Sequence, residues 1–311
     1  MQDLSRSHSR EDGVAAQVKT TCPYCGVGCG VVVTRQANGA VEIHGDRDHP
    51  ANYGRLCSKG TALAETIGLE GRLLQPVVDG ARSDWDTALD AVADRFRHVV
   101  DHHGPDAVAL YVSGQLLTED YYVANKLMKG FIGSANIDTN SRLCMSSAVA
   151  AYKRAFGSDT VPNDYADLEA AEVVVLVGTN LAWCHPVLFQ RLQAEKKRRP
   201  TLQIVVIDPR RTPTADSADL HLALAAGTDA FLFNGLLAWL DDVGQTDHGF
   251  VAEHTDGAAE ALATARWHTP SADVVATHCA LPLADVERFY RLFSSTPKVV
   301  TLFSQGINQS N

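Results

Sequence analysis

Short apolar runs alternate with amphipathic segments through the second half of the chain. Residues 173–177 (VVVLV) and 204–207 (IVVI) are continuous apolar runs of strand length, and a polar loop and a helical pattern follow each of them. Residues 299–303 form a similar run, and residues 220–224 are a weaker candidate. Apolar strands that alternate with helices predict a parallel sheet covered on both faces. Such sheets bind ligands at the carboxyl ends of their strands, which is where these polar loops fall.

Amphipathic helices are predicted in the first half of the chain as well. Apolar residues recur at helical spacing from 85 to 99, and Ser83 with Asp86 three positions later resembles a capping box. Gly104 and Pro105 end this pattern. Residues 107–112 predict a buried strand, and residues 119–131 and 145–156 predict two further helices.

The N-terminal region predicts a small separate module. After a polar tail, residues 30–43 read as two short strands joined by an Asn38-Gly39 turn, which is a strong hairpin signal. A loop then leads to an isolated cysteine, Cys57, and the module ends near Pro76.

Four cysteines in this module have the spacing C-x2-C-x3-C-x27-C. Three thiolates from one tight loop and a fourth from a distance are typical ligands of a cubane iron–sulfur cluster. Interspersed glycines let the backbone wrap close to such a cluster. A structural zinc site is the alternative, but zinc sites usually pair two C-x2-C knuckles, so the spacing favours the cluster. The cysteines are Cys22, Cys25, Cys29 and Cys57, and the glycines are Gly26, Gly28 and Gly30.

Composition and charge exclude several classes of function. With 311 residues, 45% of them hydrophobic, the chain can form about two domains with real cores. A formal net charge of -10 argues against binding to nucleic acids or anionic lipids. No apolar run approaches the roughly 18 residues that span a bilayer, so no membrane partner is expected. Seven cysteines, an odd number, fit a reducing compartment, and residues 1–20 show no export signal, so we predict a cytoplasmic protein.

Several motifs, taken in their order along the chain, resemble those of the molybdopterin oxidoreductases that carry a 4Fe-4S cluster and a bis-guanine-dinucleotide molybdenum cofactor (bis-MGD). More narrowly, the chain is similar to the catalytic subunits of assimilatory nitrate reductases. Apart from the cysteine set, each motif alone is weak, but their order and separation make coincidence unlikely. The motifs are TCPYCGVGC (21–29), CSKG (57–60), LCMSSAV (143–149), GTNLAWCHP (178–186), DPR (208–210), GTD (227–229) and QGINQ (305–309).

The strand pattern and the resemblance together predict an α/β protein, in which a small N-terminal iron–sulfur module precedes doubly wound, mostly parallel α/β domains. We expect a polar tail over residues 1–19 and the 4Fe-4S domain over 20–76. The expected first α/β domain spans 77–140 and returns, incomplete, at 297–311. The expected second α/β domain, which binds the MGD dinucleotide, spans 141–296.

The resemblance assigns a role to individual residues. It implies that the four clustered cysteines bind the 4Fe-4S cluster, that Cys144 binds molybdenum, and that Lys59 lies between cluster and pterin. From sequence alone, a lone cysteine such as Cys144 is more often a small buried hydrophobe, and the alternative for Lys59 is a solvated surface residue. The helix predicted from 145 would stabilise a thiolate at its start. Expected cofactor-binding residues are Gln115, Asn140, Gly178, Thr179, Asn180, His185, Asp208, Arg210, Gly227, Thr228, Asp229, Gln305 and Gln309.

For the polar loop residues of this set, the alternative is ordinary turn and capping chemistry, and Asp229 could simply cap the helix that follows it. The loop at 178–180 precedes a helix start, where backbone amides attract phosphate. Asp208, at a strand end, has the position of a carboxylate that holds a guanine edge or a ribose hydroxyl. Arg210 is suited to phosphate.

The implied reaction is reduction of nitrate to nitrite by oxygen-atom transfer, with electrons relayed through the cluster from ferredoxin or an NADH-linked flavoprotein. Formate dehydrogenase of the same family is the nearest alternative, but those enzymes typically place a histidine after the metal-binding cysteine, where this chain has Met145. Because family members are much longer, a third possibility is a truncated cluster-binding or cofactor-binding fragment without turnover. A purely structural zinc protein is the last alternative.

Overall fold

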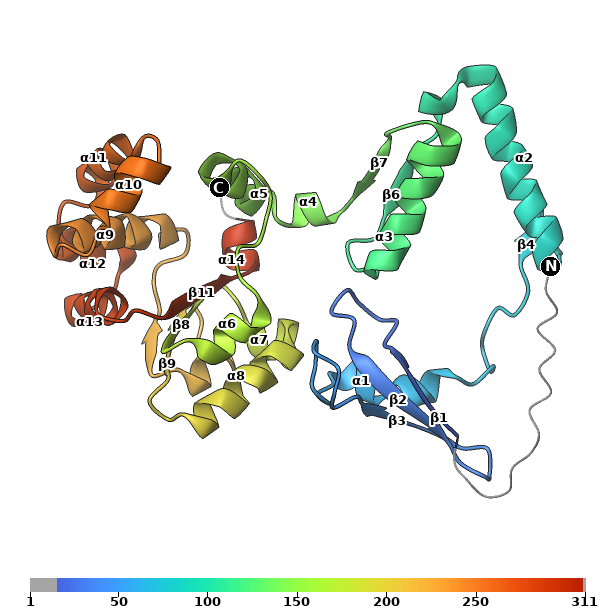
Figure 1. Ribbon diagram of the computed structural model, residues 1–311, viewed down its shortest axis with the longest axis horizontal. Helices are drawn as coiled ribbons and strands as arrows, with labels where there is room; N and C mark the ends of the chain where they lie inside the picture. Colours follow the sequence, from blue (N-terminus) through green and yellow to red (C-terminus); the bar gives the residue numbers. More distant parts are fainter. Residues whose placement is uncertain (1–15, 310–311) are drawn as a thin grey trace. The chain divides into compact units, whose positions relative to one another are not determined.

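The computed structural model describes residues 16–309 (Figure 1). The chain divides into two compact units, Met1–Ser141 and Arg142–Asn311, which are treated separately below. Most of the predicted polar tail, residues 1–15, lies outside the described residues. Among the described residues, no helix combines the length and the apolar composition that a bilayer crossing requires.

The first unit begins with a three-stranded antiparallel sheet in the order β1-β2-β3. The predicted hairpin is confirmed, because β2 (Gly30–Arg35) pairs with β3 (Val41–Gly45). β1 (Ala16–Thr21) was not predicted, so the expectation of a tail is wrong for residues 16–19. All six β1 residues are exposed, so the strand forms through backbone pairing with β2 and leaves no hydrophobic alternation in the sequence.

Helix α2 (Trp85–His103) dominates the rest of the first unit. It begins one residue later than the predicted capping box implies. Asp84, and not Ser83, caps it, because the Asp84 carboxylate accepts a hydrogen bond of 2.7 Å from Thr87 N. The other elements of this unit are α1 (Ser58–Thr61), η1 (Leu63–Thr66), β4 (Val77–Val78), β5 (Ala81–Arg82), η2 (Pro105–Ala107), β6 (Leu110–Val112), α3 (Thr118–Asn125), the π-helix η3 (Lys126–Ile132) and β7 (Ile137–Thr139).

The second unit contains a parallel four-stranded sheet in the order β10-β9-β8-β11. The predicted strands are confirmed as β8 (Val173–Val177), β9 (Gln203–Ile207), β10 (Leu220–Leu222) and β11 (Val299–Phe303). Its helices are α4 (Ser141–Cys144, at the junction), α5 (Ser146–Phe156), α6 (Tyr165–Ala170), α7 (Leu181–Cys184), α8 (Pro186–Arg198), η4 (Ala215–Ser217), α9 (Asp229–Asp242), α10 (His248–His254), α11 (Ala258–His268), α12 (Ala272–Cys279), α13 (Leu283–Ser294) and α14 (Gln305–Asn308).

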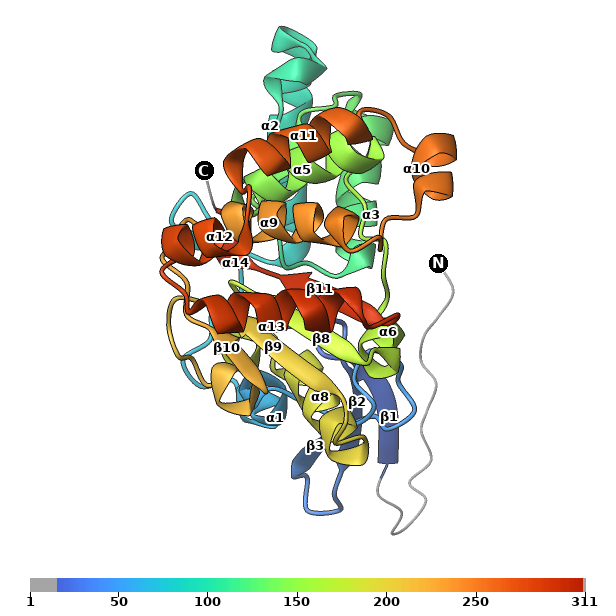
Figure 2. The same cartoon turned by 90° about the vertical axis from the view of Figure 1, so that its left-hand side faces the viewer.

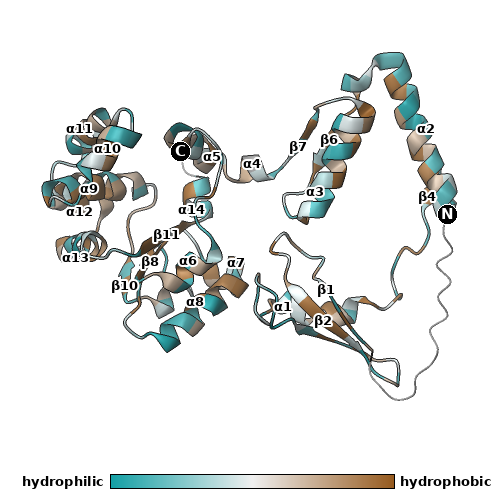
Figure 3. Cartoon of the chain, viewed as in Figure 1, coloured by the Kyte–Doolittle hydropathy of each residue, from teal (hydrophilic) through white to brown (hydrophobic). Residues whose placement is uncertain are grey.

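Both faces of this sheet are buried, which explains the continuous apolar runs. Val173, Val175 and Val177 pack into one core with α9, α12 and α13, whereas Val174 and Leu176 pack into a second core with α6, α7 and α8. These two groups of helices lie on opposite sides of the sheet (Figures 1 and 2). In Figure 3, strands β8 and β11 are brown, while the outer part of α8 is teal. The doubly wound α/β prediction is therefore confirmed.

Strand β11 lies in the sheet of the second unit. It pairs in parallel with β8, with Val299 opposite Val173 and Phe303 opposite Val177. The sequence interpretation had joined residues 297–311 to the first α/β domain. The structure differs because β8 is wholly buried, so its second edge needs a hydrogen-bonding partner, and β11 supplies it.

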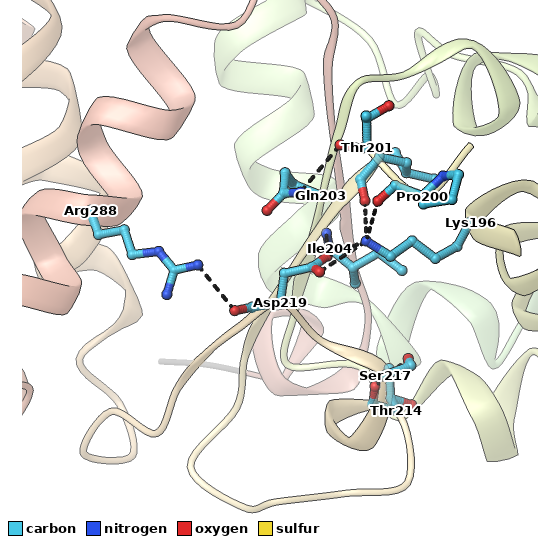
Figure 4. Close-up of polar contacts among 10 residues, drawn as sticks. Lys196, Pro200, Thr201, Gln203, Ile204, Thr214, Ser217, Asp219 and Arg288 are labelled. Carbon is cyan, nitrogen blue, oxygen red and sulfur yellow. Dashed lines mark hydrogen bonds and ion pairs between the residues drawn. The ribbon is translucent and has the colours of Figure 1, made fainter.

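Charged side chains fasten the amino ends of β9 and β10 (Figure 4). Lys196 Nζ on α8 contacts both carboxylate oxygens of Asp219, at 2.9 and 2.8 Å, and two carbonyl oxygens of the α8–β9 loop. Asp219 Oδ2 also accepts from Ile204 N at 2.7 Å, and its carbonyl accepts from Arg288 Nη2 at 3.3 Å. This network lies at the amino end of the sheet, so the carboxyl end remains available for the polar loops.

Candidate functional site

The cysteine loop of the first unit connects β1 to β2. Thr21 pairs with Gly30 at the end of the two strands, so residues 22–29 form the connection between them. Within it, Cys22 N donates to Cys29 O at 2.8 Å. Cys22 and Cys29 are buried, while Cys25 and Cys57 are partly exposed. The unpredicted strand β1 is thus what closes this loop.

The four thiols lie near enough to influence one another electrostatically. Burial, followed by the proximity of Cys22, Cys25 and Cys57, raises the pKa of Cys29 to about 11. A quartet of thiolates in this place therefore needs a compensating cation, which a bound metal centre supplies. Among residues 16–309, no group of three or more His, Cys, Asp or Glu side chains has the arrangement of a metal-ion site.

Asn52 fixes the backbone on both sides of this site. It is fully buried, and its Oδ1 accepts from Gly30 N at 2.9 Å. Its Nδ2 donates to Gly30 O at 3.0 Å and to Arg55 O at 2.9 Å. Asn52 therefore links the end of the cysteine loop to the segment that leads to Cys57. The sequence analysis missed this residue, because a lone asparagine in a loop has no spacing signal.

The other predicted residues of the first unit fall in two places. Lys59 is exposed on α1, two residues after the fourth cysteine. Asn140 follows β7, and its Oδ1 accepts from Gly114 N at 2.6 Å, which joins the loops after β6 and β7. Gln115 is exposed in the same β6 loop. The structure thus brings Gln115 and Asn140 to neighbouring strand ends, as expected for ligand loops of a parallel pair.

In the second unit, Gly178 and Gly306 bring the loops after β8 and β11 into backbone contact. Gly306 N donates to Gly178 O at 2.9 Å, and Gly178 N donates to Ile207 O at 2.8 Å. Gly178 has a φ of +53°, and a β-carbon added there would lie 2.7 Å from Gly306 Cα. Only glycine allows this approach, so two of the predicted motifs meet at the carboxyl edge of the sheet.

The loop after β8 combines an anchored amide with an unpaired hydroxyl. Thr179 is buried, and its Oγ1 has no hydrogen-bond partner among the described residues. Asn180 Oδ1 accepts from Thr214 Oγ1 at 3.0 Å, and that hydroxyl accepts from Ala182 N at 3.0 Å. Thr214, which the sequence analysis missed, therefore holds Asn180, whereas the Thr179 hydroxyl is available for a ligand.

Two carboxylates lie close together at the same edge. Asp208 is buried after β9, and its Oδ1 accepts from Arg210 N at 2.9 Å. Loss of water contact raises the pKa of Asp229, and the charge of Asp208 raises it further. Thr228 occupies the capping position of α9, so the alternative that Asp229 itself caps this helix does not hold.

Three more predicted residues, Arg210, Gly227 and His185, lie in the segments that follow β9, β10 and β8. Arg210 is exposed, and Gly227 turns the chain before α9 with a φ of +81°. The His185 side chain reaches the surface, yet desolvation by the surrounding protein lowers its pKa, so it is neutral near pH 7. Together these groups offer neutral and anionic hydrogen-bond partners, with a cation at the rim, which suits a guanine, a ribose and a phosphate.

Cys144 is the last residue of α4, and Met145 is in the capping position of α5. Helix α5 begins at Ser146, one residue later than predicted, so Cys144 lies two residues before its start. The Cys144 thiol is exposed, so the alternative of a buried hydrophobe is wrong. Gln305 Nε2 lies 2.8 Å from Cys144 Sγ. Gln309 Nε2 donates to the carbonyls of Leu143 and Cys144, at 3.0 and 2.6 Å. Both glutamines, predicted to contact the cofactor, thus contact the Cys144 segment itself.

These sites define a class of protein: a redox protein with a cysteine cage in one unit and, in the other, a dinucleotide-type parallel sheet that presents an exposed thiol. Comparison with known families agrees. Residues 15–68 match the molybdopterin oxidoreductase Fe4S4 domain, and residues 72–311 match the model described as molybdopterin oxidoreductase. The chain belongs to the molybdopterin oxidoreductase family. It therefore carries the family's domains for a 4Fe-4S cluster and a molybdopterin cofactor.

Individual relatives are consistent with this assignment. The chain is 57% identical to a nitrate reductase of Klebsiella oxytoca, over 94% of its own length and 33% of the relative's length. It is 30% identical to the F420-dependent formate dehydrogenase 1 subunit alpha of Methanococcus maripaludis, again over 94% of this chain, and 43% of that protein. It thus spans about a third of the nitrate reductase.

A solved structure confirms the fold. The acetylene hydratase of Pelobacter acetylenicus superposes with a TM-score of 0.76, over 93% of this chain and 40% of that chain. The sequence identity is 22%, so this similarity concerns the fold alone.

Proposed function

We propose that this chain forms the cluster-binding and cofactor-binding part of a nitrate reductase, which reduces nitrate to nitrite by oxygen-atom transfer. The observation that carries the proposal is the position of the Cys144 thiol. It is exposed at the carboxyl edge of the parallel sheet, where Gln305 and Gln309 hold its segment. A soft sulfur ligand beside a dinucleotide site is the donor that a molybdenum cofactor needs. Similarity to a nitrate reductase over 94% of the chain supports the substrate.

Two groups of residues would hold the cofactors. Cys22, Cys25, Cys29 and Cys57 would bind the 4Fe-4S cluster, and Cys144 would bind molybdenum. The unpaired Thr179 hydroxyl and the glycine contact at the loop ends support a ligand at the sheet edge. When bound, the molybdenum cofactor, which we propose is bis-MGD, supplies the oxygen-atom and two-electron chemistry. The proposed dinucleotide and pterin contacts are Gln115, Asn140, Gly178, Thr179, Asn180, His185, Asp208, Arg210, Gly227, Thr228 and Asp229. For Gln305 and Gln309, which the sequence analysis also assigned to the cofactor, we propose that they hold the Cys144 segment instead.

The chain's own side chains position and tune these groups. Asp208 and Asp229 offer acceptors to a guanine edge or ribose hydroxyls, and Arg210 offers charge to a phosphate. Lys59, exposed beside the fourth cysteine, would stabilise an electron added to the cluster through its positive charge. Ferredoxin or an NADH-linked flavoprotein is the proposed electron donor. We also propose a cytoplasmic location, because an odd number of cysteines, four of them at metal-ligand spacing, fits a reducing compartment, and we propose assimilation of nitrate as the role.

Two measurements on the complete gene product test the proposal. Anaerobically purified protein should contain about four iron atoms per chain with broad brown absorbance. Reduced viologen should drive nitrite formation from nitrate. Cys144→Ala should abolish turnover and spare the cluster absorbance, whereas Cys279→Ala, which removes a buried thiol, should retain turnover.

Other results would redirect the assignment. Stoichiometric zinc without iron would contradict the cluster. Formate oxidation without nitrite formation would transfer the assignment to formate dehydrogenase. Both cofactors present without turnover would identify a binding module only. Simultaneous loss of cluster and turnover in Cys144→Ala would mean that this residue is a packing element.

A further inference from the structure

We propose that Gln305 donates a hydrogen bond to the sulfur of Cys144 when that sulfur binds molybdenum, and that Asn308 is the positioning residue that sets the direction of the Gln305 amide. The inference rests on the proposed function, because it takes Cys144 as the metal ligand. It concerns a further property of that site, namely the electron density on the ligating sulfur.

The three side chains form a chain of hydrogen bonds. Gln305 Nε2 lies 2.8 Å from Cys144 Sγ, and Asn308 Nδ2 lies 3.2 Å from Gln305 Oε1. Gln305 and Asn308 are three residues apart on α14, so their side chains share one face of the helical turn. The Asn308 amide is therefore in position to hold the oxygen end of the Gln305 amide.

The backbone that carries these amides is itself fixed. Asn308 N and Ile307 N both donate to Ser304 O, at 2.9 and 3.0 Å. Gly306 N donates to the loop after β8, and its α-carbon leaves no space there for a side chain on Gly178. Helix α14 follows β11 almost directly, and its Gly306 is hydrogen-bonded to the loop after β8. The backbone that carries the Gln305 side chain is therefore fixed on both sides.

The protonation state of the sulfur decides which end of the Gln305 amide faces it. An amide has a donor end and an acceptor end, and a free thiol can either donate or accept. A metal-bound thiolate has lost its proton and can only accept. Gln305 must then present Nε2 to Cys144, which leaves Oε1 in need of a donor. Asn308 Nδ2 is that donor, and it makes the required direction the favoured one.

Stability alone does not account for an amide at position 308. Asn308 Oδ1 is buried and has no hydrogen-bond partner among the described residues. A buried acceptor without a partner lowers stability. Of the two polar atoms of the Asn308 amide, Nδ2 has a hydrogen-bond partner and Oδ1 has none among the described residues. The atom with a partner, Nδ2, is the one that orients Gln305.

A hydrogen bond to a ligating sulfur withdraws electron density from it, which stabilises the reduced metal and raises its reduction potential. Gln309 provides the contrast, because it donates to the carbonyls of Leu143 and Cys144 and not to the sulfur. Gln305 should therefore act on the potential, whereas Gln309 should act on the position of the segment.

The test is a redox titration of the molybdenum(V) resonance signal in the holoenzyme. Gln305→Leu removes the donor and should lower the midpoint potential. Asn308→Leu leaves both Cys144 and Gln305 in place and adds no charge, but it removes the donor that holds Gln305 Oε1, so the Gln305 amide should lose its fixed direction and the potential should fall as well. Gln309→Leu is the matched control, which should lower the unfolding temperature and leave the potential unchanged.

Two results would overturn the proposal. One is an equal fall of the potential in all three variants, because loosening of the segment would then be sufficient. The other is loss of molybdenum from Gln305→Leu and Asn308→Leu with retention in Gln309→Leu, since Gln305 and Asn308 would then hold the cofactor and not tune its sulfur. A molybdenum(V) signal in protein that does not reduce nitrate would refute the proposed function. The titration would still test the hydrogen bonds from Asn308 to Gln305 and from Gln305 to Cys144.

Discussion

The contact between Gly178 and Gly306 makes the carboxyl edge of the sheet sensitive to a single methyl group. Gly178→Ala should be destabilised for two reasons. The left-handed conformation at a φ of +53° costs an L-residue about 1–2 kcal/mol. The new β-carbon, 2.7 Å from Gly306 Cα, also meets backbone that cannot rotate away, a form of overpacking that costs about 1–3 kcal/mol. The sum is about 2–5 kcal/mol.

Two further variants separate these contributions. Gly306→Ala places its β-carbon 2.6 Å from Gly178 Cα without a left-handed backbone, so we expect the overpacking cost alone, about 1–3 kcal/mol. Gly244→Ala is the converse control, because Gly244 has a φ of +70° and open space around an added β-carbon. It should lose only about 1–2 kcal/mol. The double Gly178→Ala, Gly306→Ala variant should lose less than the sum of the single losses, because both methyl groups act in the same gap.

Thermal unfolding followed by circular dichroism measures these differences. A domain of this size loses about 2–4 °C of midpoint temperature per kcal/mol. The reasoning is refuted if Gly178→Ala unfolds at the same temperature as Gly244→Ala, because the collision with Gly306 would then have no energetic consequence. Additive losses in the double variant would likewise show that the two glycines do not share one gap.

Three further predictions concern other polar contacts. Asp219→Asn should cost about 1–3 kcal/mol in urea unfolding, and a double-mutant cycle with Lys196→Met should show coupling; zero coupling energy would contradict the network of Figure 4. Asn52→Leu unpairs three backbone groups, two of them in buried hydrogen bonds, so it should cost about 2–5 kcal/mol and release iron, and a variant with full iron content would disprove this role. The pKa of Asp229 is raised, so the folded state binds more protons than the unfolded state, and stability should fall as pH rises from its ordinary pKa through the raised one. In cofactor-free protein, Asp229→Asn should remove this fall and unfold at a higher temperature near pH 7; an unchanged pH profile would assign the fall to other groups.

The strands of the second unit were predictable because burial on both faces leaves a signal in every residue. All five positions of β8 are buried, so the run VVVLV has no alternative interpretation as an amphipathic element. β1 shows the opposite case. Its residues are all exposed, and it exists because its backbone pairs with β2, a source of stability that side-chain patterns do not record.

The proposed ligands were predictable from the sequence, whereas the residues that support them were not. Cysteine spacing reports ligand geometry directly, and Cys144 stands in a recognisable motif. Asn52, Thr214 and Asn308 are single polar residues that contact their partners through one to three hydrogen bonds each, and Asn52 and Thr214 reach 22 and 34 residues along the chain. One polar residue in a loop has no periodicity, so only the folded structure identifies its partner.

Neutral amides position the segments that carry the sulfurs in both units, and this choice has a physical consequence. Asn52 holds the backbone around the cysteine cage, and Gln305 and Gln309 hold the segment of Cys144. A charged anchor a few ångströms from a redox centre would interact with each added electron by about 4 kcal/mol at 4 Å and an effective dielectric constant of 20. Its position would then change with the redox state. An amide keeps almost the same interaction with the backbone before and after electron transfer, so the sulfurs can keep one geometry through both states.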